Sequence, residues 1–246
     1  MDILYVVGNG STWKNNELRY SLRSIAKHGR NIDRVYLVGA KPDFVSNRVH
    51  FLPCNDPYDR KHKNILHKVL KAVEKTDIGN HFLISSDDHF YAKDVDFDNL
   101  PIYYRNEEIP ASYPAEKLTN SYNRSLLQTR SLLLKYGLPI YQTNPHCNTH
   151  FRKDIYKANK YLFDEAITLE DGGEMNCIMG NLFVLNGVVP QPFKDSKLSK
   201  DKYKDRKTFM ERIKDQECFS MADKSLEWGI GDYLATLFPE KCIYEI

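Results

Sequence analysis

The stretch that most constrains the fold runs from His81 to Lys93 and reads HFLISSDDHFYAK. An apolar run is followed directly by two adjacent carboxylates, Asp87 and Asp88, and then by His89. A buried strand that ends in paired acids holds hard oxygen ligands at a sheet edge, which suits Mg²⁺ or Mn²⁺ carried with a substrate diphosphate. The alternative is an acidic turn after a strand, because Asp is common in turns.

The first third of the chain alternates short β-rich runs with amphipathic patterns. Strands are expected at 3–7, 35–38, 48–52 and 82–84, and helices at 15–25 and 62–74. This alternation predicts an α/β fold with a mixed, mostly parallel sheet flanked by helices. Ligands of such sheets bind beyond the carboxyl ends of the strands, where the Gly8 loop and the paired acids would both lie.

The rest of the chain is less regular. Helices are expected at 121–136, 154–163 and 226–238, and a short strand at 243–244. With 246 residues, the chain is expected to form a single domain over 1–246. Its nucleotide-binding half would be 1–93, and its acceptor-binding half would be 94–246.

Composition excludes several classes. The net charge of +2 gives no global field that favours nucleic acid or a membrane surface. The five cysteines are scattered, odd in number and without a CxxC pair, which is typical of reduced thiols in a cytosol. The chain begins without a basic signal-peptide region, and no segment approaches the roughly 20 apolar residues of a membrane span. A cytoplasmic protein is expected.

Three regions of the first third are candidates for binding a nucleotide. The strand expected at 3–7 ends in a loop that contains Gly8 and Gly10. Such a loop lets the backbone approach a ligand, although a simple turn has the same pattern. In the first helix Arg19 and Arg23 are spaced to clamp a phosphate, or they form a solvated face. In the next helix Asn64 and Lys68 share a polar stripe.

Histidines and acids in the second half are candidates for ligands and bases. His146 and His150 flank Cys147, and one histidine would complete a metal site that Asp88 begins. A zinc site of these three residues would lack a fourth ligand at the usual spacing. Further on, Asp171 and Glu174 stand in a glycine-containing loop and are either general bases or parts of a helix start.

A lysine-rich loop is expected at 194–207, where seven basic residues stand against three aspartates, a local net of +4. Such a loop grips phosphates or follows a nucleic acid backbone, or it is a solvated, flexible segment.

The order of these motifs resembles a known family. NNELRYSLRSI at 15–25, a VYLVG strand, SDDHF at 86–90 and FPEKCIYE at 238–245 are similar to Stealth-type sugar-phosphate transferases and to small phage and bacterial glycosyltransferases with a GT-A-like fold. The resemblance spans nearly the whole chain. Ser86 stands where those proteins have Asn or Asp, so Asp88, in the last position, is the natural metal ligand.

The resemblance implies a metal-dependent glycosyltransferase that moves a sugar from a nucleotide-sugar donor to a hydroxyl acceptor. Asp88, with Asp87 and His146, would hold Mn²⁺ or Mg²⁺ on the donor diphosphate. Asp171 or Glu174 would deprotonate the acceptor if the anomeric centre inverts. The donor would contact Val7, Gly8, Asn9, Gly10, Arg19, Arg23, Asn64 and Lys68.

Other functions stay open. A Stealth-like enzyme would transfer a sugar 1-phosphate and release a nucleoside monophosphate. A non-catalytic nucleic-acid-binding module would use the lysine-rich loop and the aromatic residues, although no recognised binding motif is visible. A phage enzyme that glycosylates a hydroxymethylated DNA base would combine glycosyl transfer with nucleic-acid binding. A glycan is the other expected acceptor.

Overall fold

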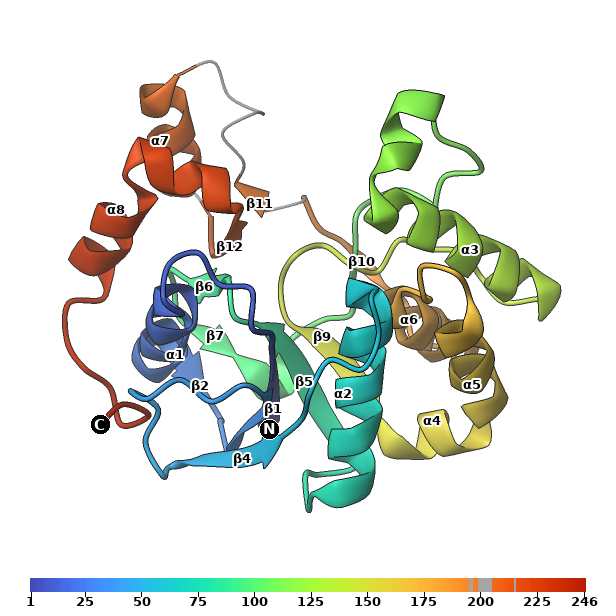
Figure 1. Cartoon of the computed structure of the whole chain (residues 1–246), viewed down its shortest axis with the longest axis horizontal. Coiled ribbons are helices and arrows are strands. Elements are labelled where there is room, and N and C mark those ends of the chain that lie inside the picture. The colour runs from blue at the N-terminus through green and yellow to red at the C-terminus, as the bar shows by residue number, and fades with distance from the viewer. Residues whose placement is uncertain (195–196, 199–204, 215) are drawn as a thin grey trace.

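A five-stranded sheet forms the centre of the molecule in the computed structural model, which describes residues 1–194, 197–198, 205–214 and 216–246 (Figure 1). Its order is β4-β3-β1-β5-β9. The first four strands are parallel, and β9 pairs antiparallel with β5. The strands are β1 (Asp2–Val7), β3 (Val35–Gly39), β4 (Val49–Pro53), β5 (His81–Ser86) and β9 (Thr149–Arg152).

Helices cover both faces of this sheet because its strands alternate between two apolar sets. Ile3 and Tyr5 of β1 pack in one cluster with α1 (Asn16–His28), whose Leu18 and Leu22 are fully buried. Leu4 packs in a second cluster on the opposite face, against α2 (Lys61–Lys75) and further helices. Those helices are α3 (Ser121–Lys135), α4 (Lys153–Ala158), α5 (Lys160–Thr168) and α6 (Met175–Leu185).

A third cluster lies beyond α1, on the left of Figure 1. It is built on a small sheet of order β11-β12-β6, with strands β6 (His89–Tyr91), β11 (Lys197–Leu198) and β12 (Cys218–Met221). Three helical segments complete it: α7 (Arg206–Lys214), the 3₁₀ helix η4 (Asp223–Trp228) and α8 (Ile230–Leu237). Short pairs join β2 (Gly29–Arg30) to β7 (Val95–Asp96), and β8 (Tyr103–Tyr104) to β10 (Gln191–Pro192). Two further 3₁₀ helices are η1 (Phe97–Asn99) and η2 (Ala115–Thr119).

The predicted fold class is confirmed, and three local predictions were wrong. The helix expected at 226–238 is divided into η4 and α8 by Gly229, whose φ of +79° is left-handed and interrupts the helix. The helix expected at 154–163 is divided at Asn159 into α4 and α5. The strand expected at 243–244 is a turn, and Glu245 then forms an isolated bridge with Val45.

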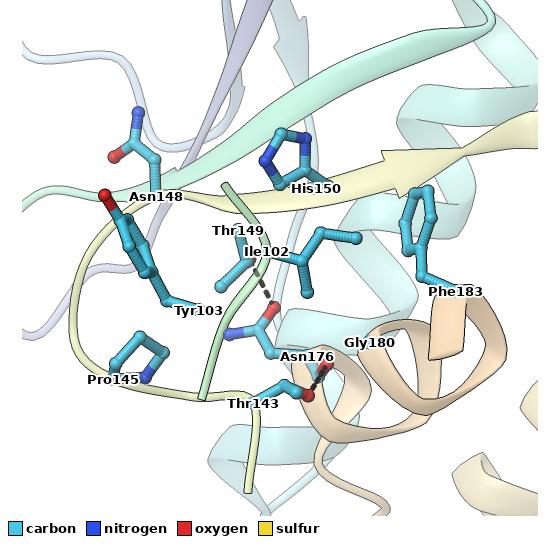
Figure 2. Close-up of a pocket in the computed structure, with 10 residues that line it drawn as sticks. All are labelled: Ile102, Tyr103, Thr143, Pro145, Asn148, Thr149, His150, Asn176, Gly180 and Phe183. Atoms are coloured by element: carbon cyan, nitrogen blue, oxygen red, sulfur yellow. Dashed lines mark hydrogen bonds between the residues drawn. The ribbon is translucent and has the colours of Figure 1, made fainter. Parts of the chain in front are cut away.

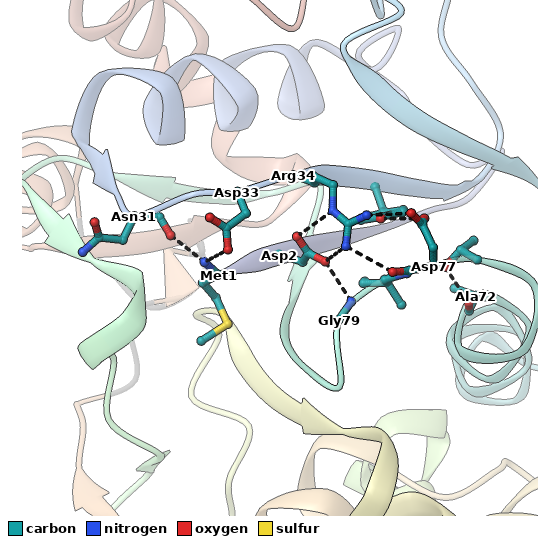
Figure 3. A network of polar contacts seen from close by, with 11 residues as sticks. Met1, Asp2, Asn31, Asp33, Arg34, Ala72, Asp77 and Gly79 are labelled. Atoms are coloured by element: carbon teal, nitrogen blue, oxygen red, sulfur yellow. Dashed lines mark hydrogen bonds and ion pairs between the residues drawn. The ribbon is translucent and has the colours of Figure 1, made fainter.

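A polar network holds the amino ends of β1 and β3 and the loop that leads into β5 (Figure 3). Arg34 donates from Nη2 to Asp2 Oδ2 at 2.8 Å and from Nη1 to Asp77 Oδ2 at 2.7 Å. Asp2 also accepts from the Gly79 N–H, and Asp77 accepts from the Tyr36 hydroxyl. The carboxylates at this edge therefore all have partners. No helix among the described residues is long and apolar enough to cross a membrane.

Candidate active site

The paired acids form a tight turn at the opposite, carboxyl edge of the sheet. Asp87 and Asp88 connect β5 directly to β6, and both side chains are half-buried. Ser86 at the end of β5 is in register with Val6 of β1. Because β1 and β5 are parallel neighbours, the loop that begins at Gly8 and the acidic turn leave the sheet side by side, as predicted.

The acidic turn carries an excess of negative charge. Burial, together with the charges of Asp88 and Glu17, raises the pKa of Asp87 to about 7, and Lys61 only partly opposes this. Glu17 Oε2 is buried and has no hydrogen-bond partner within the described residues. Neither aspartate of the turn makes an ion pair with a described side chain, so a cation would relieve the repulsion among these carboxylates.

His89 is part of the scaffold under the turn. Burial lowers its pKa to about 4, so the imidazole is neutral near neutral pH. Its ring lies 3.4 Å from Asn148 Oδ1, and its backbone carbonyl accepts from Ser21 Oγ of α1. The amide of Tyr91 donates to Ser24 Oγ, one turn further along α1. These contacts fix α1, β6 and the segment before β9 around the acids.

The register of β9 separates the two histidines that the sequence left as alternatives. His150 pairs with Leu83 in the middle of β5, and its Nδ1 lies 3.0 Å from His81 Nε2. The antiparallel pairing, continued beyond Thr149, leads towards the acidic turn, where His146 contributes to the pKa of His89. Of the two histidines, His146 is therefore the one near the acids. Its φ of +58° is left-handed.

Only some of the residues predicted to bind the donor nucleotide lie together in the structure. Lys68 is buried; its Nζ donates to the Val7 carbonyl at 2.9 Å and lies 2.5 Å from Asp56 Oδ1. Gly39 packs beside them with φ +124°, and a Cβ there would lie 1.9 Å from the Val7 oxygen. Asn64 instead holds the backbone of Tyr58, as acceptor and donor. The Gly8–Gly10 segment is an irregular loop after β1.

The two arginines of α1 bind the C-terminal segment. Arg23 forms a bidentate pair with Glu245, at 2.6 and 3.0 Å, and also donates to the carbonyl of Phe238. Arg19 lies 3.4 Å from the same carboxylate, which is fully buried. Although burial acts to raise the pKa of Glu245, the Arg23 hydrogen bonds hold it below its usual value. The two arginines therefore fix the first helix against the C-terminal segment, and they do not form a solvated face.

The two predicted bases have different surroundings. Asp171 is fully buried and accepts two hydrogen bonds from Arg124, at 2.7 and 2.8 Å, which lower its pKa. Glu174 precedes α6, and its Oε2 lies 3.3 Å from His62 Nδ1 at the start of α2. Sequence reasoning missed His62, because only the folded chain brings α2 next to the 170–174 loop.

Metal binding can be tested against the side chains present. Within the described ranges, no three His, Cys, Asp or Glu side chains are arranged to hold a metal ion by themselves. The zinc alternative therefore lacks support, and Cys147 is buried in the core beside α1. Mg²⁺ and Mn²⁺ need less from the protein, because one or two carboxylates and substrate phosphates commonly suffice. The uncompensated pair Asp87–Asp88 fits that type of site.

A small pocket lies between β9, α6 and the chain at Ile102 and Tyr103 (Figure 2). One of its lining residues, Asn148, contacts the ring of His89. Tyr103, Pro145, Asn148 and Asn176 are among the residues that line it. Asn148 Nδ2 is buried and has no hydrogen-bond partner within the described residues. Asn176, which also lines this pocket, carried no signal in the sequence.

The lysine-rich loop at 194–207 is described only at 194, 197–198 and 205–207. Residues 195–196 and 199–204 lie outside the described residues, and 206–207 begin α7. The predicted phosphate-gripping role of 194–207 stays a prediction.

Comparisons with known proteins show the fold. No family model matches the chain, and no curated protein matches it, so the relation to Stealth-type transferases stays a prediction. Among solved structures, the chain is similar to the galactosyltransferase LgtC in complex with donor and acceptor sugar analogues, with 11% identity, a TM-score of 0.55 and coverage of 98% of this chain and 96% of that one. An active-site mutant of LgtC gives 12% identity, a TM-score of 0.51 and coverage of 96% and 95%. The chain therefore has a GT-A-like glycosyltransferase fold.

Proposed function

We propose that this protein is a glycosyltransferase that moves a sugar from a nucleotide-sugar donor to a hydroxyl acceptor. The observation that carries the proposal is the Asp87–Asp88 turn, where carboxylates whose charge is only partly compensated lie beside the loop after β1 at the carboxyl edge of the sheet. The end-to-end similarity to LgtC, crystallised with donor and acceptor sugar analogues, supports the same reading. Fold likeness alone would not carry it.

Asp88 and Asp87, with His146, would hold Mn²⁺ or Mg²⁺ against the donor diphosphate. The metal would supply Lewis-acid stabilisation of the departing nucleoside diphosphate. The backbone of Val7 to Gly10 would approach the nucleotide, and Lys68 would hold that loop in place through the Val7 carbonyl. Lys61, exposed at the first turn of α2 and acting on Asp87, would add positive charge next to the diphosphate.

Glu174 is the better base of the two acids proposed from the sequence. A base must accept a proton, and the paired hydrogen bonds from Arg124 stabilise Asp171 in its charged form. Within the part of the chain that the structure describes, the Glu174 carboxylate has one ion-pair contact, to His62, which would orient it. Arg19 and Arg23 are left out of the proposed donor site because Glu245 binds both.

The decisive experiment identifies the nucleotide that is released. Purified protein is first screened for thermal stabilisation by nucleotide sugars with and without Mn²⁺, because a ligand of the native state raises the melting temperature. The stabilising donor is then incubated with candidate glycan acceptors. Release of a nucleoside diphosphate is expected; a monophosphate would favour sugar-1-phosphate transfer. Stabilisation by DNA alone would contradict the proposal, and modification of hydroxymethylated DNA would assign the acceptor.

A further inference from the structure

A second groove lies on the other side of α1, between its first turn and the segment from η4 to α8. It is open to solvent, and the space within it, open solvent included, is about 710 Å³. Trp13, Asn16 and Tyr20 line it from the start of α1, and Gly231 and Asp232 line it from α8. In Figure 1 these two elements lie next to each other at the left of the view. No residue singled out for the proposed transfer reaction lines this groove.

The aromatic side of the groove is held in place. The rings of Trp13 and Tyr20 stack with centroids 5.5 Å apart and an interplanar angle of 26°. The guanidinium of Arg23 lies over the Tyr20 ring at 5.4 Å. Gly231 allows Trp13 to approach α8, because a Cβ at that position would lie 2.8 Å from the indole Cζ2. The Trp13 backbone is fixed as well, since its N–H donates to Ser11 Oγ and its carbonyl accepts from Asn16 Nδ2.

The polar side of the groove offers two hydrogen-bond acceptors, the Asp232 carboxylate and Asn16 Oδ1. Asp232 is exposed, and within the described residues no donor is bonded to its carboxylate. Asn16 uses its amide N–H on Trp13, which leaves Oδ1 without a donor from the described chain. Among the described residues that line the groove, Asp232 is the only one with a charged side chain, and the guanidinium of Arg206 approaches the lining residue Gly229. The Asp232 carboxylate repels a phosphate placed next to it, whereas a neutral ligand with several hydroxyl groups would donate to both Asp232 and Asn16.

We propose that this groove binds a neutral saccharide, with a pyranose ring against the Trp13–Tyr20 pair and its hydroxyl groups on Asp232 and Asn16. The C–H face of a pyranose is weakly positive and complements the negative face of an aromatic ring. Asn16, which lines the groove, is followed by Glu17, whose charge acts on Asp87. A glycan in the groove would therefore extend towards the transfer site. The role of this glycan as acceptor rests on the proposed function, whereas its binding in the groove does not.

The test measures the binding of neutral disaccharides that end in glucose, galactose or N-acetylglucosamine. Saturation-transfer NMR detects the binding, and calorimetry gives its affinity. At least one disaccharide is expected to bind the unmodified protein. D232A and W13A are each expected to weaken that binding by about tenfold or more. D223A, at an exposed aspartate of η4, is the matched control and is expected to bind normally. Because Trp13 also packs on α8, D232A decides the result if W13A fails to fold.

Several outcomes would overturn the inference. Absence of binding across the panel, or full binding by D232A, excludes the groove as a saccharide site. Loss of nucleotide-sugar binding in D232A would assign the groove to the donor instead. The proposed function is judged separately, with D88N. Loss of transfer in D88N with saccharide binding retained is expected if both proposals hold. Saccharide binding by an unmodified protein that transfers no sugar from any nucleotide sugar would leave the groove standing and remove the transferase. Transfer by an unmodified protein that binds none of the disaccharides would do the reverse.

Discussion

The two edges of the central sheet carry similar acids in opposite surroundings. At the amino edge, Asp2 and Asp77 share Arg34 and accept further hydrogen bonds from Gly79 and Tyr36. At the carboxyl edge, Asp87 faces the charges of Asp88 and Glu17 and has a raised pKa. Paired acids stabilise a fold, whereas acids held together without partners cost stability and are kept for binding or chemistry. The difference between the edges, more than the presence of acids, marks the site.

The largest expected effect is a test of whether the carboxyl edge performs the chemistry. D88N should lower kcat/KM for sugar transfer by at least about a hundredfold, because it removes a proposed ligand of the metal that would stabilise the leaving diphosphate. Thermal unfolding should show a folded protein. D77N at the amino edge is the control and should retain transfer. Full activity in D88N would remove the distinction between the edges.

A second comparison tests which of the two histidines, His146 or His150, binds the metal. H146N should weaken Mn²⁺ or Mg²⁺ binding, measured by calorimetry with a bound nucleoside diphosphate, by roughly 10- to 100-fold. Asn is chosen because it tolerates the left-handed backbone at this position. H150N should leave metal affinity unchanged, since His150 contacts His81 in the middle of the sheet. Equal losses in both variants would contradict the assignment from the β9 register.

The amino edge should respond in stability alone. D2A removes the acceptor of the Arg34 and Gly79 donors and should lower the free energy of unfolding by about 1–3 kcal/mol. Urea unfolding at neutral pH measures this loss. Specific activity per folded molecule should not change. A D2A protein of unchanged stability would show that the network is dispensable.

The smallest effect is a pH dependence at the carboxyl edge. Because the folded-state pKa of Asp87 is raised to about 7, the native protein binds a proton that the unfolded chain has released between about pH 4 and pH 7. Its stability therefore falls as pH rises through that window. D87N should be more stable than the unmodified protein by about 1 kcal/mol or more at pH 8, and the gain should vanish near pH 4. A gain that is constant with pH would contradict the raised pKa.

The sequence predicted the sheet well because its signals are local. The apolar runs of β1, β3 and β5 and the glycines and acids that follow them are readable without tertiary context. The site was only partly predictable, because partners are set by long-range packing. The pairing of Arg23 with Glu245 joins residues more than two hundred positions apart, and that of Asp171 with Arg124 depends on how α3 meets the 170–174 loop. Neither pairing has a periodicity or a motif.

The ion pair between Arg23 and Glu245 also affects the order in which the chain folds. The first helix is made early in synthesis, but its buried ion-pair partner and the Val45–Glu245 bridge are supplied about two hundred residues later. Contacts so distant along the chain close slowly, because loop entropy must be overcome before they form. Until residue 245 leaves the ribosome, α1 keeps two unpaired arginines on its surface. The nascent chain is then expected to remain open along this seam, where a chaperone that prefers basic, partly apolar segments would bind.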